Sequence, residues 1–308
     1  MLQKFRGEIY CLLGALFFSS SGIVSKIVLL DEISAWQLTQ ARTTGAFLIL
    51  FTFFIIFRRS ELKPTKKELP WLLLFGLIGV ALVQALYFVA IERMYVGVAL
   101  LIEFTAPIWI LLFLRFVLQK HVPSGLWSAI FLAFSGLLLI TQVWNGLTLD
   151  RIGFIAAVFS AITLAGYFLI GDHLSQTKTT GAIAVWGFGV CSFGLLFIFP
   201  IWEYPIDVLE KDLNLLGAFS NNSLPAWVLV LWIIVMGTIA PYLLTLAGLK
   251  ILSASTASIF GMMEPVLAGM IAWWWLSESL TAIQLLGCLV VIVGIAIADR
   301  ARQHTVKI

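Results

Sequence analysis

Residues 70–118 read PWLLLFGLIGVALVQALYFVAIERMYVGVALLIEFTAPIWILLFLRFVL, and this stretch decides the class of fold. It contains two long apolar runs, 70–91 and 96–118, which are separated by a short polar turn around Glu92 and Arg93. A bilayer core about 30 Å thick is crossed by about 20 apolar residues in an α-helix. Each run is therefore predicted to be a transmembrane helix.

Similar runs recur along the whole chain, which is 61% hydrophobic and only 11% charged. A soluble domain carries about a quarter charged residues, so this composition excludes a soluble protein. Helices pair their own backbone groups in lipid, whereas a β-barrel would show shorter segments of alternating polarity. We expect an all-α polytopic membrane protein with ten transmembrane helices, near residues 8–30, 36–57, 70–91, 96–118, 124–141, 151–171, 181–201, 226–249, 255–276 and 281–298.

Lysine and arginine in short loops favour the cytoplasmic side of a membrane. With both ends of the chain inside, only Arg93, Arg151 and Lys211 lie outside, and the inner segments hold Lys4, Arg6, Arg58, Arg59, Lys63, Lys66, Lys67, Lys120, Lys178, Lys250, Arg300, Arg302 and Lys307. This asymmetry predicts cytoplasmic N- and C-termini, including a tail at 299–308. We expect the protein in the cytoplasmic (inner) membrane of a bacterium, with the lipid bilayer as a partner. The net charge of +3 is too small to indicate a nucleic-acid partner.

The sequence repeats itself. A shift of 158 residues places Pro107 on Pro265 and Gly136 on Gly294, and a shift of 146 places Gly7 on Gly153. We therefore predict two five-helix units, 1–141 and 151–298. Because each unit has an odd number of spans, the second enters the membrane from the opposite side. Inverted repeats of this kind are typical of transporters, which open a central site to alternate sides.

Two stretches then carry a resemblance to a known family. Residues 85–118, and more closely residues 247–297, resemble the EamA-type repeat of the drug/metabolite transporter superfamily. In that repeat a helix of small residues leads to a mid-helix proline, an acidic turn and a glycine-bearing helix, here Pro265, Glu278, Gly287 and Gly294. The first copy departs from it, because Gln119, Lys120 and His121 replace the usual Gly-Glu-Arg turn.

The resemblance implies a secondary carrier that works by alternating access. Members of the family export amino acids, move nucleotide sugars or sugar phosphates, or expel toxic cations. A deep acid together with basic and aromatic groups suits a zwitterion with an apolar part, so the expected substrate is an amino acid or related metabolite, and the expected direction is export. A phosphate substrate would call for more cavity lysines and arginines. A membrane receptor or enzyme is a further alternative.

Ionisable groups within the predicted spans are the first candidates for a substrate site, because such groups cost about 3 kcal/mol in lipid. These are Lys26, Arg42, Glu103 and Glu264. At 1.5 Å per residue, Lys26 lies about 6 Å, and Arg42 and Glu103 about 10 Å, from the outer boundary. Either base is predicted to form a salt bridge with Glu103, which would lower the cost of burial. Alternatively, Lys26 extends towards the outer surface and Arg42 caps a loop.

Glu264 lies about 13 Å from the inner boundary, near the midplane. The other repeat has Ala106 at the equivalent position. We predict that Glu264 faces the central cavity and influences substrate handling, and a carboxyl group there would allow proton coupling. The alternative is a protonated carboxyl, hydrogen-bonded between packed helices.

Further candidates come from the repeat. Pro107 and Pro265 each remove a backbone hydrogen bond, which predicts a helix break that either serves substrate binding or is a structural kink. Gln84 aligns with Tyr242 and Tyr87 with Thr245, and residues three apart share one helical face, which predicts two polar cavity walls or two packing faces. No catalytic motif, phosphate loop or metal-ligand cluster is evident, so neither enzyme activity nor a cofactor or metal is expected.

Overall fold

The computed structural model describes residues 5–30, 33–145, 150–198 and 206–305. Within these residues, nine helices are at least 18 residues long and apolar enough to cross a membrane. One further apolar helix, α10 (Thr180–Leu196), has 17 residues. The prediction of an all-α polytopic membrane protein is confirmed.

The ten helical spans follow the predicted runs closely. Their bounds are α1 (Arg6–Leu29), α2 (Ala35–Phe57), Leu69–Arg93, Val96–Val117, α8 (Ser124–Thr141), α9 (Arg151–Ser175), α10, Ala226–Leu249, Ala254–Leu276 and α16 (Ala282–Thr305). Three bounds differ from expectation: α9 continues to Ser175, α16 continues to Thr305, and α10 ends at Leu196. Most of the predicted tail at 299–308 therefore continues the last helix. The last three residues of the predicted span 181–201 lie outside the described residues.

Three of these spans contain a π-helical segment: Val96–Val117 ends in η3 (Phe113–Val117), and two others carry theirs at equivalent places in the two repeats. The span Leu69–Arg93 consists of α4 (Leu69–Leu74), the π-helical η2 (Phe75–Leu82) and α5 (Val83–Arg93). Its partner consists of α12 (Ala226–Ile234), the π-helical η7 (Val235–Ile239) and α13 (Ala240–Leu249). Such insertions are frequent at functional sites.

The next span of each repeat is broken in the middle. Two residues separate α6 (Val96–Glu103) from α7 (Ala106–Leu112), and two residues separate α14 (Ala254–Gly261) from α15 (Glu264–Leu276). A proline occupies the first turn of both α7 and α15, where its missing N–H costs nothing. The second break lies at the same place as the first after a shift of 158 residues.

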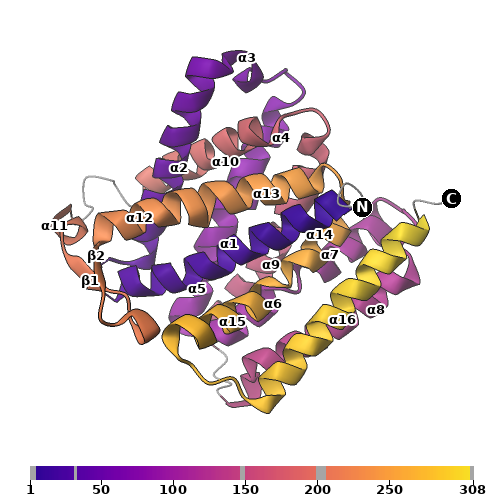
Figure 1. Cartoon of the computed structure of the whole chain (residues 1–308). Helices are drawn as coiled ribbons and strands as arrows, with labels where there is room; N and C mark the ends of the chain where they lie inside the picture. The colour runs from indigo at the N-terminus through magenta and orange to yellow at the C-terminus, as the bar shows by residue number, and fades with distance from the viewer. Residues whose placement is uncertain (1–4, 31–32, 146–149, 199–205, 306–308) are drawn as a thin grey trace.

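The two repeats are interlocked rather than laid side by side. Helix α1 packs on α13, α14 and α15 of the second repeat, and α9 packs on α5, α6 and α7 of the first (Figure 1). The first helix of each repeat therefore packs among helices of the other repeat.

Helices α8 and α16, the last of each repeat, form a close pair at one side of the molecule (Figure 1). Gly136 and Gly287 face each other, and a Cβ atom built on Gly287 would lie 2.7 Å from the Gly136 carbonyl oxygen. Small residues that let backbones approach are typical of helix contacts in membranes, where lipid is as apolar as leucine. These glycines therefore serve packing.

A small β-hairpin was not anticipated from the sequence. Strands β1 (Asp212–Asn214) and β2 (Ser223–Pro225) pair antiparallel in the connection before α12. The Trp275 indole at the end of α15 donates to the Leu215 carbonyl at 2.9 Å. Gly217, with φ +49°, lies against the backbone of Trp275, where a side chain would clash. The hairpin thus fastens this connection to the end of α15.

Because the spans are even in number, α1 begins and α16 ends on the same side of the helical layer. We call this side the terminal face and the other the opposite face. The N and C labels lie near each other in Figure 1. The α1–α2 connection, the hairpin and the turn after α15 lie at the opposite face.

Candidate functional site

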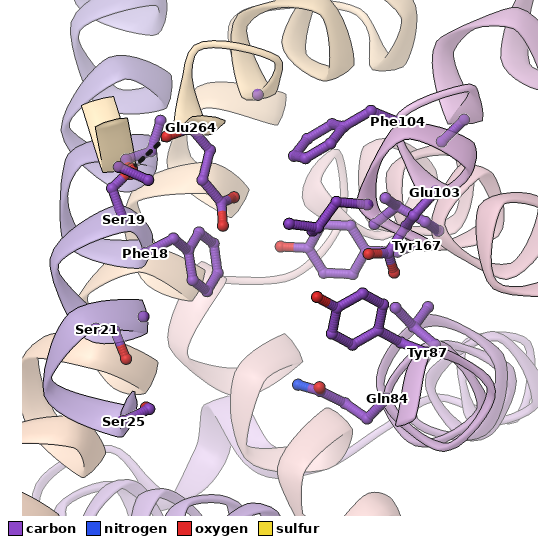
Figure 2. Close-up of a pocket in the computed structure, with 18 of the residues that line it drawn as sticks. Phe18, Ser19, Ser21, Ser25, Gln84, Tyr87, Glu103, Phe104, Tyr167 and Glu264 are labelled. Atoms are coloured by element: carbon purple, nitrogen blue, oxygen red, sulfur yellow. Dashed lines mark hydrogen bonds between the residues drawn. The ribbon is translucent and has the colours of Figure 1, made fainter. Parts of the chain in front are cut away.

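A cavity of about 820 Å³ lies between the two repeats and contains residues from both. One wall, here called the α1 wall, consists of α1, α14 and α15. The other, the α9 wall, consists of α5, α6 and α9. Figure 2 shows Phe18, Ser19 and Glu264 on the first wall facing Tyr87, Glu103 and Tyr167 on the second. The cavity is large enough for a small metabolite.

The cavity opens towards the opposite face. Leu29, Leu30, Ala35 and Val96, at the opposite-face ends of their helices, are among its lining residues. Its deep end is reached at Cys11, Tyr167, Phe168, Thr245 and Ser258, about halfway along their helices or deeper. Between this end and the terminal face, the structure is filled by buried side chains, including Leu174, Ser175, Leu246, Leu249, Leu252 and Thr256.

All eight candidate binding residues line this one cavity: Lys26, Arg42, Gln84, Tyr87, Glu103, Tyr242, Thr245 and Glu264. Pro107 also lines it, whereas Pro265 does not. The π-helical segments end directly before Val83 and Ala240, so Gln84 and Tyr242 lie in the first turn of α5 and α13 respectively. Gln84 also lies within hydrogen-bonding reach of Tyr242, its equivalent in the other repeat. Whether these residues bind substrate stays a prediction.

The predicted salt bridge to Glu103 is wrong for both bases. Lys26 instead pairs with Glu278, with 3.1 Å between Nζ and Oε1. Glu103 accepts a hydrogen bond of 2.8 Å from the Ser160 hydroxyl, and no ion pair joins it to Arg42 among the described residues. The reason is spatial: Lys26 lies on the α1 wall, and the open cavity separates it from Glu103 on α6.

Glu103 and Glu264 are acidic side chains that line the cavity. They flank the two helix breaks, Glu103 as the last residue of α6 and Glu264 as the first of α15. Their carboxylates are close enough to act on each other electrostatically. The Glu264 carboxylate has no hydrogen-bond or ion-pair partner among the described residues, although its backbone carbonyl accepts from the Ser19 hydroxyl at 2.8 Å. It is therefore available to a cationic group.

Arg42, like Lys26, is a basic side chain that lines the cavity. Its Nε atom is buried and lacks a hydrogen-bond partner in the described part of the chain. The guanidinium is near enough to Glu264 and Tyr242 to influence both electrostatically. A buried donor without a partner costs about 1–3 kcal/mol, so a ligand carboxylate or water at this position would be stabilised.

Aromatic rings form the floor of the cavity. Tyr242 contacts Phe18, Tyr167 and Phe188, with ring centroids 5.4, 5.7 and 4.9 Å apart. The hydroxyl of Tyr167 is buried and lacks a hydrogen-bond partner among the described residues. This floor offers an apolar surface with one unused polar group.

Sequence reasoning did not identify Ser160, Phe18 or Asp172. Ser160 and Phe18 carry no signal in an apolar helix, because small polar and aromatic residues are common in packing there. Asp172 had a usable signal, since a shift of 146 residues places it on Lys26. The predicted span ends at residue 171, so Asp172 is not among the ionisable groups within the predicted spans.

Comparison with known proteins agrees with this architecture. The model of the EamA-like transporter family matches residues 5–142 and 151–298. The chain belongs to the EamA-like transporter family. Membership makes it a transporter of the drug/metabolite transporter superfamily, and the two matched segments correspond to the two five-helix repeats.

Several curated relatives of this EamA-like transporter are similar over most of their length. The uncharacterized inner membrane transporter YicL of Salmonella typhimurium is 24% identical, over 93% of each chain. The threonine/homoserine exporter RhtA of Salmonella typhimurium is 26% identical over 92% of this chain and 88% of the relative. A solved crystal structure, 15% identical, matches with a TM-score of 0.75 over 96% of this chain and 98% of that one, which shows the same fold.

Proposed function

We propose that this transporter exports a small zwitterionic metabolite, such as an amino acid, by alternating access. The observation that supports this most is that one cavity presents both a guanidinium and carboxylates. A substrate carboxylate would lie at Arg42 and its ammonium group at Glu264, with its apolar part on the aromatic floor. Charge-assisted hydrogen bonds of this kind are about twice as strong as neutral ones.

Two further observations support the proposal. The relative RhtA is named a threonine/homoserine exporter, although it is only 26% identical. The symmetrical helix breaks and π-helical segments supply bends at matching places in both repeats, as exchange between two inverted conformations requires. Among the described residues, Lys26 and Arg42 are the basic side chains that line the cavity, fewer than a nucleotide sugar or sugar phosphate would call for.

A second candidate is an organic cation. It is favoured by the two carboxylates, Glu103 and Glu264, which act on each other across the cavity. A cation could lie between them with its apolar part against Phe18 and Tyr242. In this case Arg42 would repel the substrate rather than bind it.

Counterflow in liposomes separates the candidates. Vesicles containing the purified protein are loaded with an unlabelled compound, and uptake of the same labelled compound is measured. We expect counterflow of a neutral amino acid but not of its methyl ester, which lacks the carboxylate that Arg42 would bind. Counterflow of the methyl ester and of a quaternary ammonium ion, without counterflow of the amino acid, would indicate that the substrate is an organic cation. Activity with none of these, but with a nucleotide sugar, would contradict both.

The direction of transport depends on topology, for which we propose that the terminal face is cytoplasmic. The basis is the excess of lysine and arginine in the connections on that face. A cysteine at Asn222 should react with an impermeant maleimide from outside right-side-out vesicles, and a cysteine at Lys66 only after permeabilisation. Both positions are exposed and lie outside the spans. Labelling of both from the same side would refute the inverted topology.

A further inference from the structure

Asp172 joins the two cavity walls at the terminal face. It lies near the end of α9, below the closed end of the cavity. Its Oδ2 accepts a hydrogen bond of 3.2 Å from the backbone N–H of Ala254, the first residue of α14. Because α9 belongs to one wall and α14 to the other, this contact holds the walls together where the cavity is closed.

The surroundings of this contact are densely packed. Ser175 and Thr256, close in sequence to Asp172 and Ala254, are buried, and so are Leu174 and Leu249. None of these residues lines the cavity. Opening the terminal face would require α9 to move away from the start of α14, which would break the hydrogen bond from Ala254 to Asp172.

The repeat places different chemistry at the equivalent point of the opposite face. A shift of 146 residues relates Asp172 to Lys26, and a shift of 158 relates Ala254 to Val96. Lys26 and Val96 both line the open cavity. There the Lys26 ammonium is paired with Glu278 at 3.1 Å, and both side chains are more than half exposed.

Electrostatic interactions stabilise closure of the terminal face more than closure of the opposite face. A helix N-terminus carries a partial positive charge, so a carboxylate beside it is stabilised and an ammonium group is not. Closing the terminal face brings Asp172 to the N-terminus of α14, where it also accepts an N–H hydrogen bond. Closing the opposite face in the mirrored manner would bring Lys26 to the N-terminus of α6, which carries no side-chain cap.

We infer that Asp172 is a positioning residue for transport, which holds the terminal-face gate closed through the N-terminus of α14. Lys26, at the equivalent position, leaves the opposite-face gate without a matching contact. The resting carrier is therefore open at the opposite face. This inference rests on the proposed alternating access. It states that the difference between Asp172 and Lys26 determines which face is closed in the resting carrier.

Cysteine accessibility tests this without any substrate. With Cys11, Cys191 and Cys288 replaced by alanine, a reporter cysteine is placed at Ser255, which is buried next to Ala254. In detergent micelles, where both faces are accessible, Asp172→Ala should raise the rate of maleimide labelling at this reporter about tenfold. That shift corresponds to about 1.4 kcal/mol, close to the lower limit for a hydrogen bond to a charged group.

Matched variants show whether the effect belongs to the gate. A second reporter at Ser25, on the cavity wall towards the opposite face, should be labelled more slowly in Asp172→Ala. Asp172→Asn keeps an acceptor for the Ala254 N–H, and its labelling rate should fall between those of the parent and Asp172→Ala. Lys26→Ala should leave the Ser255 reporter at the parent rate. A monodisperse size-exclusion profile confirms that each variant is folded.

Exchanging the charges at the opposite face gives an independent test. At the terminal face, Asp172 lies within electrostatic range of Lys120, and Lys120 is the residue equivalent to Glu278. The double variant Lys26→Asp with Glu278→Lys places the same acid and base at the opposite face. It should slow labelling at Ser25 several-fold, because an acceptor for the N-terminus of α6 is now present. Parent labelling rates in both Asp172→Ala and this variant would overturn the inference, and a positive counterflow result would then leave the proposed function standing.

Discussion

Replacing Glu264 by glutamine is expected to reduce counterflow of a zwitterionic substrate at least tenfold. The Glu264 carboxylate lines the cavity and lacks a hydrogen-bond or ion-pair partner among the described residues, so it is free to bind a substrate ammonium group. Loss of a hydrogen bond between charged groups costs about 1.5–3 kcal/mol, which is tenfold or more in affinity. If the same carboxyl also carries protons, the pH profile of transport should become flatter in the variant.

Folding should survive this substitution. Glutamine keeps the shape of the side chain and removes a charge from the membrane interior, which costs about 3 kcal/mol to place there. The matched control is Glu210→Gln, the same change at an exposed position in the connection before α12, and its counterflow rate should equal that of the parent. An unchanged rate and pH profile in Glu264→Gln would show that Glu264 serves packing.

Substituting alanine for Gly287 is expected to lower the midpoint of thermal unfolding by about 2–12 °C. A Cβ atom at this position would lie 2.7 Å from the Gly136 carbonyl oxygen and 2.9 Å from the Ile140 nitrogen. Both are backbone atoms of α8, so α8 and α16 would have to move apart. Overpacking of this kind costs about 1–3 kcal/mol, and 1 kcal/mol shifts the midpoint by about 2–4 °C in a protein of this size class.

The same substitution at Gly194 provides the control with the opposite sign. No atom lies within 4 Å of a Cβ built there, and the residue lies within α10. Alanine is the better helix former by about 1 kcal/mol, so Gly194→Ala should match or exceed the parent. The midpoint is measured by size exclusion of detergent-purified protein after heating. Equal midpoints for the two variants would contradict the close approach of α8 and α16.

Much of the architecture could be predicted from the sequence. The spans follow from runs of apolar residues, because a helix in lipid must pair its backbone within itself. The five-helix repeats follow from identities at constant shifts, such as Pro107 with Pro265. Ionisable residues such as Glu264 are conspicuous because membrane spans are otherwise apolar. Residues of the cavity wall could therefore be predicted from the sequence, although their hydrogen-bond and ion-pair partners could not.

The partners were decided by tertiary structure. Local sequence sets where a helix begins, bends and ends, but the contacts of Lys26 and Glu103 depend on which helices of the other repeat lie beside them. The interlocking of α1 with α14 and α15 places Lys26 beside Glu278, and that of α9 with α6 places Ser160 beside Glu103. The same packing brings Asp172 to Ala254, 82 residues away in the chain. Such pairs arise only once the two repeats have packed, because no pattern along one helix specifies its neighbour.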